Sequence, residues 1–149
     1  MIVHQKYTAD EIAALQTVYE QAIYEVYNGE ETIPLHIGSC CPRLDELIVQ
    51  ESPHNCNYWA LVTAHNPRSQ SLSTNENQER HYRLVKHLQE LKLPYLPGVG
   101  KDASGIWTPE ASLCILGIEL NQAISIGERF NQNAIVYGEL NRPIRLQWL

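Results

Sequence analysis

The chain has 149 residues, of which 44% are hydrophobic, and this length fits one globular domain. Seventeen acidic residues outnumber 11 Lys and Arg, which gives a formal net charge of -6, and no window gathers basic residues into a stripe. This distribution argues against nucleic acid as a partner, because a phosphate backbone is bound by clustered cations. No run approaches the ~20 apolar residues of a membrane span, and Met1 to Tyr7 lacks a leader pattern. We therefore expect a single cytoplasmic domain over residues 1–149 with no membrane partner.

Residues 1–57 are expected to form a helix, a strand and a connection. The segment Thr8-Ala9-Asp10-Glu11 has the residues of a capping box, so a helix is predicted to begin there. We predict about five turns that end near Asn28-Gly29, and we expect this helix to cover the sheet face opposite the later helices. A short strand is predicted at 33–37, and the connection 39–57 has a helical pattern at 44–49. The apolar positions with helical spacing are Ile12, Leu15, Tyr19, Ile23 and Val26.

Residues 58–138 alternate between strand and helix patterns. Strands are predicted at 58–65, 94–98, 111–117 and 133–138. Helices are predicted from the capping box at Ser73 to about Leu91 and at 120–130. This order predicts an α+β fold with a ferredoxin-like βαββαβ core.

The residue types also predict positions in this sheet. The first and third strands are continuously apolar and fit the centre, whereas Pro94 and Pro97 place the second at an edge. Residues 139–149 are predicted to add a C-terminal strand, because 144–148 alternates between apolar and polar residues and follows a turn near Pro143.

Hydrogen-bonding side chains follow the first core strand in the segment 63–69. We take the first and third strands to be parallel, with the fourth antiparallel beside the first, so Gln132-Asn133 is expected next to the end of the first strand. Helical steps back from Leu84 through His81 place Asn77 at the same edge. Buried amides need partners, so this cluster is either a bonded network or a set of ligand contacts. The candidate ligand-binding residues are Thr63, His65, Asn66, Arg68, Ser69, Asn77, Gln132 and Asn133.

Two of these residues can carry charge. Arg68 and His65, together with a helix N-terminus, would suit a carboxylate or a phosphate. A solvated loop cation and a half-buried polar cap are the more common structural roles for such residues. No standard catalytic signature is present, so no catalytic residue is assigned.

Three further patterns are kept apart from the amide cluster. The segment 98–101, Gly-Val-Gly-Lys, lacks P-loop spacing and is interpreted as a flexible hairpin. With parallel first and third strands, Trp107 and Glu110 would lie at the opposite end of the sheet from the amide cluster, as a separate site at most. The adjacent Cys40 and Cys41, with His54 and Cys56, lack the paired spacing of zinc ligands, so we expect no metal and no other cofactor.

Several short blocks, in order along the chain, resemble the uncharacterised bacterial family called domain of unknown function 3293. The resemblance extends over residues 58–138 and implies no known activity. It supports treating 63–69 and Gln132-Asn133 as parts of one feature. His65 stands where the family usually has an aromatic residue, so a role of this histidine would not extend to relatives. The matching blocks are 63–69, Asn77, Glu110-Ala111-Ser112, Gly117 and Gln132-Asn133-Ala134-Ile135.

The leading functional hypothesis is a domain that binds a small polar or anionic ligand through Asn66, Asn77 and Gln132. The competing hypothesis is a protein-interaction or regulatory module, in which the cluster is structural and an open sheet edge or the first helix binds a protein partner. An enzyme that uses His65 with Arg68 ranks below both, because no base has an evident partner.

Overall fold

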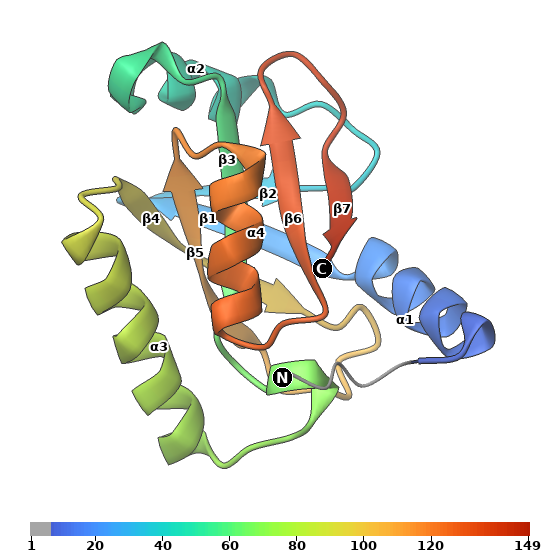
Figure 1. Ribbon diagram of the computed structural model, residues 1–149. Coiled ribbons are helices and arrows are strands. Elements are labelled where there is room, and N and C mark those ends of the chain that lie inside the picture. Colours follow the sequence, from blue (N-terminus) through green and yellow to red (C-terminus); the bar gives the residue numbers. More distant parts are fainter. Residues whose placement is uncertain (1–6) are drawn as a thin grey trace.

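The computed structural model describes residues 7–149, except for the side chain of Pro53, so the prediction made for Met1 to Tyr7 lies almost wholly outside it. Its strands form one seven-stranded sheet in the order β2-β1-β4-β5-β3-β6-β7, in which every neighbouring pair is antiparallel (Figure 1). The elements are α1 (Ala9–Gln21), β1 (Ile23–Asn28), β2 (Glu31–Leu35), α2 (Pro42–Glu51), β3 (Tyr58–Thr63), α3 (Thr74–Glu90), β4 (Tyr95–Lys101), β5 (Glu110–Leu116), α4 (Leu120–Arg129), β6 (Ala134–Glu139) and β7 (Arg145–Trp148), with short 3-10 turns at Pro53–Asn55 and Pro67–Ser69.

The predicted α+β class is confirmed, but the seven-stranded sheet is larger than the core that we expected, and β3 and β5 are antiparallel where we took the first and third core strands to be parallel. β7 forms the predicted hairpin with β6. β4 does not lie at an edge, because β1 and β2 extend the sheet on that side. β1 pairs with β4 only over residues 98–101, so Pro94 and Pro97 lie beyond this pairing and their missing N–H groups do not interrupt it.

The first predicted helix is too long. α1 begins after Thr8, whose hydroxyl accepts a hydrogen bond from the Glu11 N–H at 3.1 Å, but it ends at Gln21, and β1 follows. Ile23 and Val26 of β1 satisfy helical spacing, but four of the six residues of this strand are β-branched or aromatic, so pairing with β2 and β4 decides its conformation. The chain then turns tightly at Gly29, whose φ of +62° suits glycine.

The segment 98–101 belongs to β4 and pairs with both β1 and β5, so its interpretation as a flexible hairpin is wrong. A Cβ atom at Gly98 would lie 2.8 Å from the backbone oxygen of Glu25. Glycine therefore permits the close approach of β1 at this point. The connection between β4 and β5 is residues 102–109 instead.

Helices cover both faces of the sheet. α3 and α4 pack on one face, where Leu84, Leu88 and Ile126 join the apolar side chains of β3, β5 and β6. α2 covers the other face through Leu44 and Ile48. The expectation that the first helix would cover this face is therefore wrong in the main, because α2 does so and α1 contributes no buried residue.

Candidate functional site

The direction of β5 determines which residues meet at the end of β3. The two strands are antiparallel, whereas the sequence analysis took them to be parallel, so Thr63 pairs with Ser112 and Glu110 lies at the same edge. The predicted separation of Glu110 from the amide cluster is therefore wrong. Asn66 Nδ2 donates a hydrogen bond to Glu110 Oε1 at 2.9 Å. β6 is antiparallel beside β3, as predicted, and its start brings Asn133 to this edge.

Asn66 is the centre of a hydrogen-bonded network. Its φ of 47° is left-handed, a conformation that Asn tolerates better than most residues. Its backbone N–H donates to Asn77 Oδ1 at 2.9 Å, and Asn77 Nδ2 donates back to Asn66 Oδ1 at 2.9 Å. The Leu72 N–H donates to the same oxygen at 3.0 Å. Together with Glu110, these partners fix the turn after β3 to the start of α3.

A second group of polar side chains connects this turn to α1. Tyr19 projects from α1, and its hydroxyl shares a hydrogen bond with Ser69 Oγ at 2.8 Å. Asn133 Nδ2 donates to the Tyr19 hydroxyl at 3.1 Å and to Ser69 Oγ at 3.0 Å. The Tyr7 hydroxyl donates to the Arg68 carbonyl at 3.0 Å. α1 is therefore attached to this edge through Tyr19, whose hydroxyl makes these polar contacts and whose ring contacts Trp148 with centroids 5.8 Å apart.

Thr63 and Gln132 bind backbone groups. Thr63 Oγ1 donates to the Ala111 carbonyl at 2.8 Å and accepts from the His65 N–H at 3.0 Å. Gln132 Nε2 donates to the carbonyls of His65, at 3.1 Å, and Phe130, at 3.3 Å. These bonds hold the end of β3 against β5 and the α4–β6 connection.

Arg80 is a structural cation that the sequence analysis missed. Its Nε donates to the Ala64 carbonyl at 2.6 Å, and its Nη2 donates to the Phe130 carbonyl at the C-terminal end of α4. Cations are favoured at that end of a helix by the helix dipole. Its position among the charged residues of α3 gave no signal of this role in the sequence.

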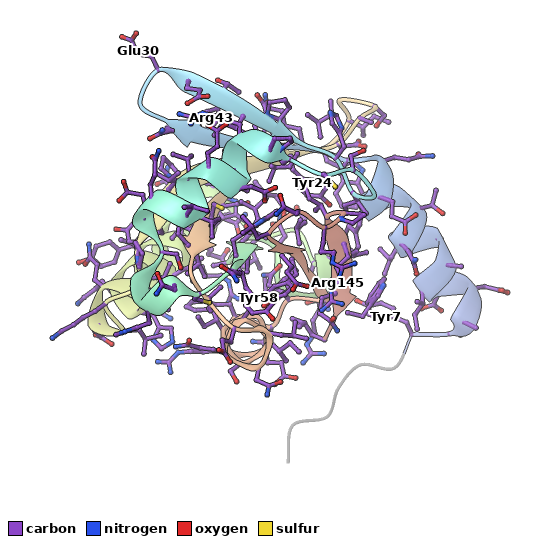
Figure 2. All side chains as sticks on the ribbon, turned by 90° about the horizontal axis from the view of Figure 1, so that it is seen from above. Tyr7, Tyr24, Glu30, Arg43, Tyr58 and Arg145 are labelled. Atoms are coloured by element: carbon purple, nitrogen blue, oxygen red, sulfur yellow. The ribbon has the colours of Figure 1, made fainter. Side chains whose placement is uncertain are left out.

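A cavity of about 170 Å³ lies next to this network, on the sheet face that α2 covers elsewhere. α1 and the loop 102–109 border it, and Leu61, Val136 and Leu146 contribute apolar walls. Figure 2 shows Tyr24 between the β1–β2 hairpin and α1, in agreement with the hydrogen bond from its hydroxyl to the Tyr19 carbonyl at 2.7 Å. Trp107, which the sequence analysis also placed at the far end of the sheet, lines the cavity.

The cavity separates the predicted site residues into two sets. His65, Arg68 and Asn77 do not line it. The His65 ring lies edge-on to the ring of His81 with centroids 6.0 Å apart, and burial, followed by the charges of His81 and Arg80, lowers its pKa. The predicted residues that do line the cavity are Thr63, Asn66, Ser69, Gln132 and Asn133.

Two titratable groups that line the cavity, Glu110 and Tyr24, have raised pKa values. Burial raises the pKa of the Glu110 carboxyl, and the hydrogen bond from Asn66 opposes this shift. Burial also raises the pKa of the Tyr24 hydroxyl, with smaller contributions from Tyr19 and Glu110. Glu110 was missed as a site residue only because its strand was given the wrong direction. A polar residue just before a buried strand was the available signal.

The fold and the site together define an α+β domain with a partly apolar cavity beside a hydrogen-bonded amide network. The model of the family described as "Protein of unknown function (DUF3293)" matches residues 62–135, and the chain belongs to this family. The matched region begins in β3 and ends in β6, so it includes the Asn66 network and Glu110. A comparison with curated proteins and a comparison with solved structures each found no match.

Two further findings concern the described residues as a whole. No helix within residues 7–149 is both long enough and apolar enough to cross a membrane. In the same residues, no three side chains of His, Cys, Asp or Glu are grouped as metal ligands would be.

Proposed function

We propose that the protein binds a small molecule in the cavity beside Glu110. The observation that carries this proposal is a half-buried carboxylate that lines a cavity. Asn66 binds one oxygen of Glu110, and the other oxygen has no hydrogen bond to any described residue. Partly buried charges are costly unless they are paired, so a ligand with a hydrogen-bond donor would stabilise this group.

The shape and lining of the cavity support the same proposal. Small-molecule sites are concave and mostly apolar, with a few convergent polar groups. Here α1, β3 and β6 contribute apolar side chains such as Leu15, Leu61 and Val136, and the polar groups include Asn66, Glu110 and Gln132. Gln132 and Asn133 donate to protein groups, but their side-chain oxygens accept no hydrogen bond from the described residues. These two oxygens are therefore available to donors on a ligand.

The amide network has a supporting role in this proposal. Asn66 and Asn77 are bonded to each other, so they fix the turn and orient Glu110. The sequence left two alternatives open for these amides, a bonded network or a set of ligand contacts. In this proposal the amides form a bonded network that borders the ligand site. The bonded amides form the frame, and the cavity they border receives the ligand.

The test is a screen of neutral, cationic and anionic fragments, read by thermal shift and by amide chemical shifts. Fragments should raise the unfolding midpoint and shift the amide signals of Glu110 and Ser112. Trp107→Ala should weaken these responses, because Trp107 lines the cavity. Tyr82→Ala is the matched control, because Tyr82 is also an exposed aromatic residue but lies on α3 and does not line the cavity. This change should leave the thermal and chemical shifts unchanged. A complete absence of shifts around the cavity would refute the proposal.

A protein-interaction role is the second candidate, and one observation favours it. Ile106 is 82% exposed and Trp107 is 53% exposed on the loop beside α1, where Val18 is also exposed. Neighbouring exposed apolar side chains often mark contact surfaces. Ile106→Ser should then abolish capture of a specific partner protein without changing fragment binding. Equal capture of that partner by the wild type and by the variant would exclude this surface.

A further inference from the structure

Resting on the proposed function, we further propose that the ligand of this cavity is an organic cation. It would carry an ammonium or related cationic group on a small apolar or aromatic body. The charges of the lining, its aromatic rings and the fixed position of Glu110 each support this ligand class.

The charged side chains of the lining leave a net negative site. They are Lys101, Asp102 and Glu110, and neither Arg nor His occurs among the lining residues that the structure describes. Lys101 Nζ is bonded to Glu25 Oε1 at 2.5 Å, so its charge is already offset by a carboxylate on the neighbouring strand. The charges of Asp102 and Glu110 are offset by no cation of the lining. An anion would face both carboxylates, whereas a cation would be attracted by them.

Aromatic rings at the same cavity favour the same ligand class. Tyr19, Tyr24 and Trp107 all line it. The hydroxyl of Tyr24 is bonded to the Tyr19 carbonyl, so this residue has mainly its ring to offer to a ligand. The Tyr24 ring lies close to Gly100, where a Cβ atom would be 3.5 Å from its Cε1. Aromatic faces attract organic cations, and an aromatic ring beside a carboxylate is a common arrangement for binding an ammonium group.

Glu110 is held in place before any ligand arrives. Asn66 donates to one carboxylate oxygen, and Asn66 is itself fixed by Asn77 and by the Leu72 N–H. The second oxygen is left for a charge-assisted hydrogen bond, which is stronger than a neutral one. Such preorganisation lowers the cost of binding, because little has to be ordered when the ligand binds.

The pH dependence of binding follows from the same groups. Burial raises the pKa of Glu110, so as the pH falls this carboxylate is protonated earlier than an exposed glutamate, and protonation removes the charge that a cation needs. The other titratable groups of the lining are the hydroxyls of Tyr19 and Tyr24, the Asp102 carboxylate and the paired Lys101. Hydrogen bonds from Ser104 lower the pKa of Asp102, so Asp102 keeps its charge to lower pH than Glu110 does. Affinity for a cation should therefore fall as the pH falls, and Glu110→Gln should abolish most of this change.

The experiment compares three probes of nearly equal size with the whole chain. At pH 7 benzylamine is a cation, benzyl alcohol is neutral and benzoate is an anion. We expect benzylamine to bind about tenfold more tightly than benzyl alcohol, as measured by chemical-shift titration, and benzoate to bind least. Glu110→Gln keeps an oxygen that can accept the hydrogen bond from Asn66 Nδ2. In this variant benzylamine and benzyl alcohol should bind about equally tightly. The matched control is Glu119→Gln, which removes an exposed carboxylate at the start of α4 and should change nothing.

Each result has a defined meaning. Equal binding of benzylamine and benzyl alcohol at the cavity would overturn this inference and leave the proposed function standing. The tightest binding by benzoate would overturn it in favour of an anionic ligand. No cavity shifts with any probe would overturn both proposals. If Glu110→Gln lowers the unfolding midpoint strongly, Asp102→Asn provides the second test, and an unchanged preference in that variant would also count against the inference.

Discussion

Replacing Asn66 with alanine is expected to lower the free energy of unfolding by about 3 kcal/mol. The side chain makes three hydrogen bonds, with the Leu72 N–H, with Asn77 Nδ2 and with Glu110 Oε1. Each is worth about 1 kcal/mol, and the left-handed backbone costs alanine about a further 1 kcal/mol. Partial solvent exposure of the turn reduces the total somewhat, because water replaces some of the lost bonds.

Asn66→Gly is the matched variant for this prediction. It loses the same three hydrogen bonds, but glycine adopts a φ of 47° without steric cost, so it should be about 1 kcal/mol less destabilised than Asn66→Ala. Urea unfolding followed by tryptophan fluorescence measures both, since Trp59 is almost completely buried. A loss of less than about 0.5 kcal/mol for Asn66→Ala would refute the reasoning about the network. Equal losses in the two variants would refute the reasoning about the backbone.

Three other substitutions test the core and the buried titratable groups. Gly138→Ala should destabilise the protein by about 2 kcal/mol in urea unfolding, because a Cβ atom would lie 2.1 Å from the buried Trp59 ring. Glu110 has a folded-state pKa above its ordinary 4.5, so the stability it contributes is present below that pH and is lost as the pH rises through the folded-state pKa. Glu110→Gln should therefore be more stable than wild type at pH 7, and this difference in the free energy of unfolding should be smaller at pH 4. A difference that is the same at pH 4 and pH 7 would contradict the linkage argument. Burial lowers the pKa of His81 below 6.5, so its contribution is present above that pH and is lost on acidification. His81→Leu should therefore flatten the decline in thermal midpoint below pH 6.5, and an unchanged decline would exclude a role for this histidine.

Features that depend on neighbouring residues in the chain could be predicted from the sequence. The capping box at Ser73 is an example. The Glu76 N–H donates to the Ser73 hydroxyl and the Ser73 N–H donates to the Glu76 carboxylate, and neither hydrogen bond depends on distant parts of the fold. Asn77 faces the sheet as predicted, at 8% exposure, because helical periodicity fixes its face once the helix is known. The convergence of Asn133 with the end of β3 was also predictable from the antiparallel pairing of β3 and β6.

Features that depend on distant pairing could not be read from the chain alone. The residues from Ile23 to Val26 fit a helix and a strand equally well, and the choice is made by hydrogen bonds to β2 and β4. The direction of β5 was the more consequential error. That direction follows from the connections and not from the side chains, because a helical crossover returns β4 parallel to β3 and the short β4–β5 connection makes β5 antiparallel to both. The reversal moves Glu110 from the far end of the sheet to the cavity.

The outer strands of the sheet limit how another chain can associate with this protein. Within the described residues, β2 and β7 are the outermost strands. β2 carries Pro34, which has no N–H to give to an added strand, and β7 has only four residues, beginning with the exposed Arg145. Prolines, charges and short length at sheet edges all oppose edge-to-edge pairing. Amyloid-like growth and partner recognition by strand addition are therefore both disfavoured.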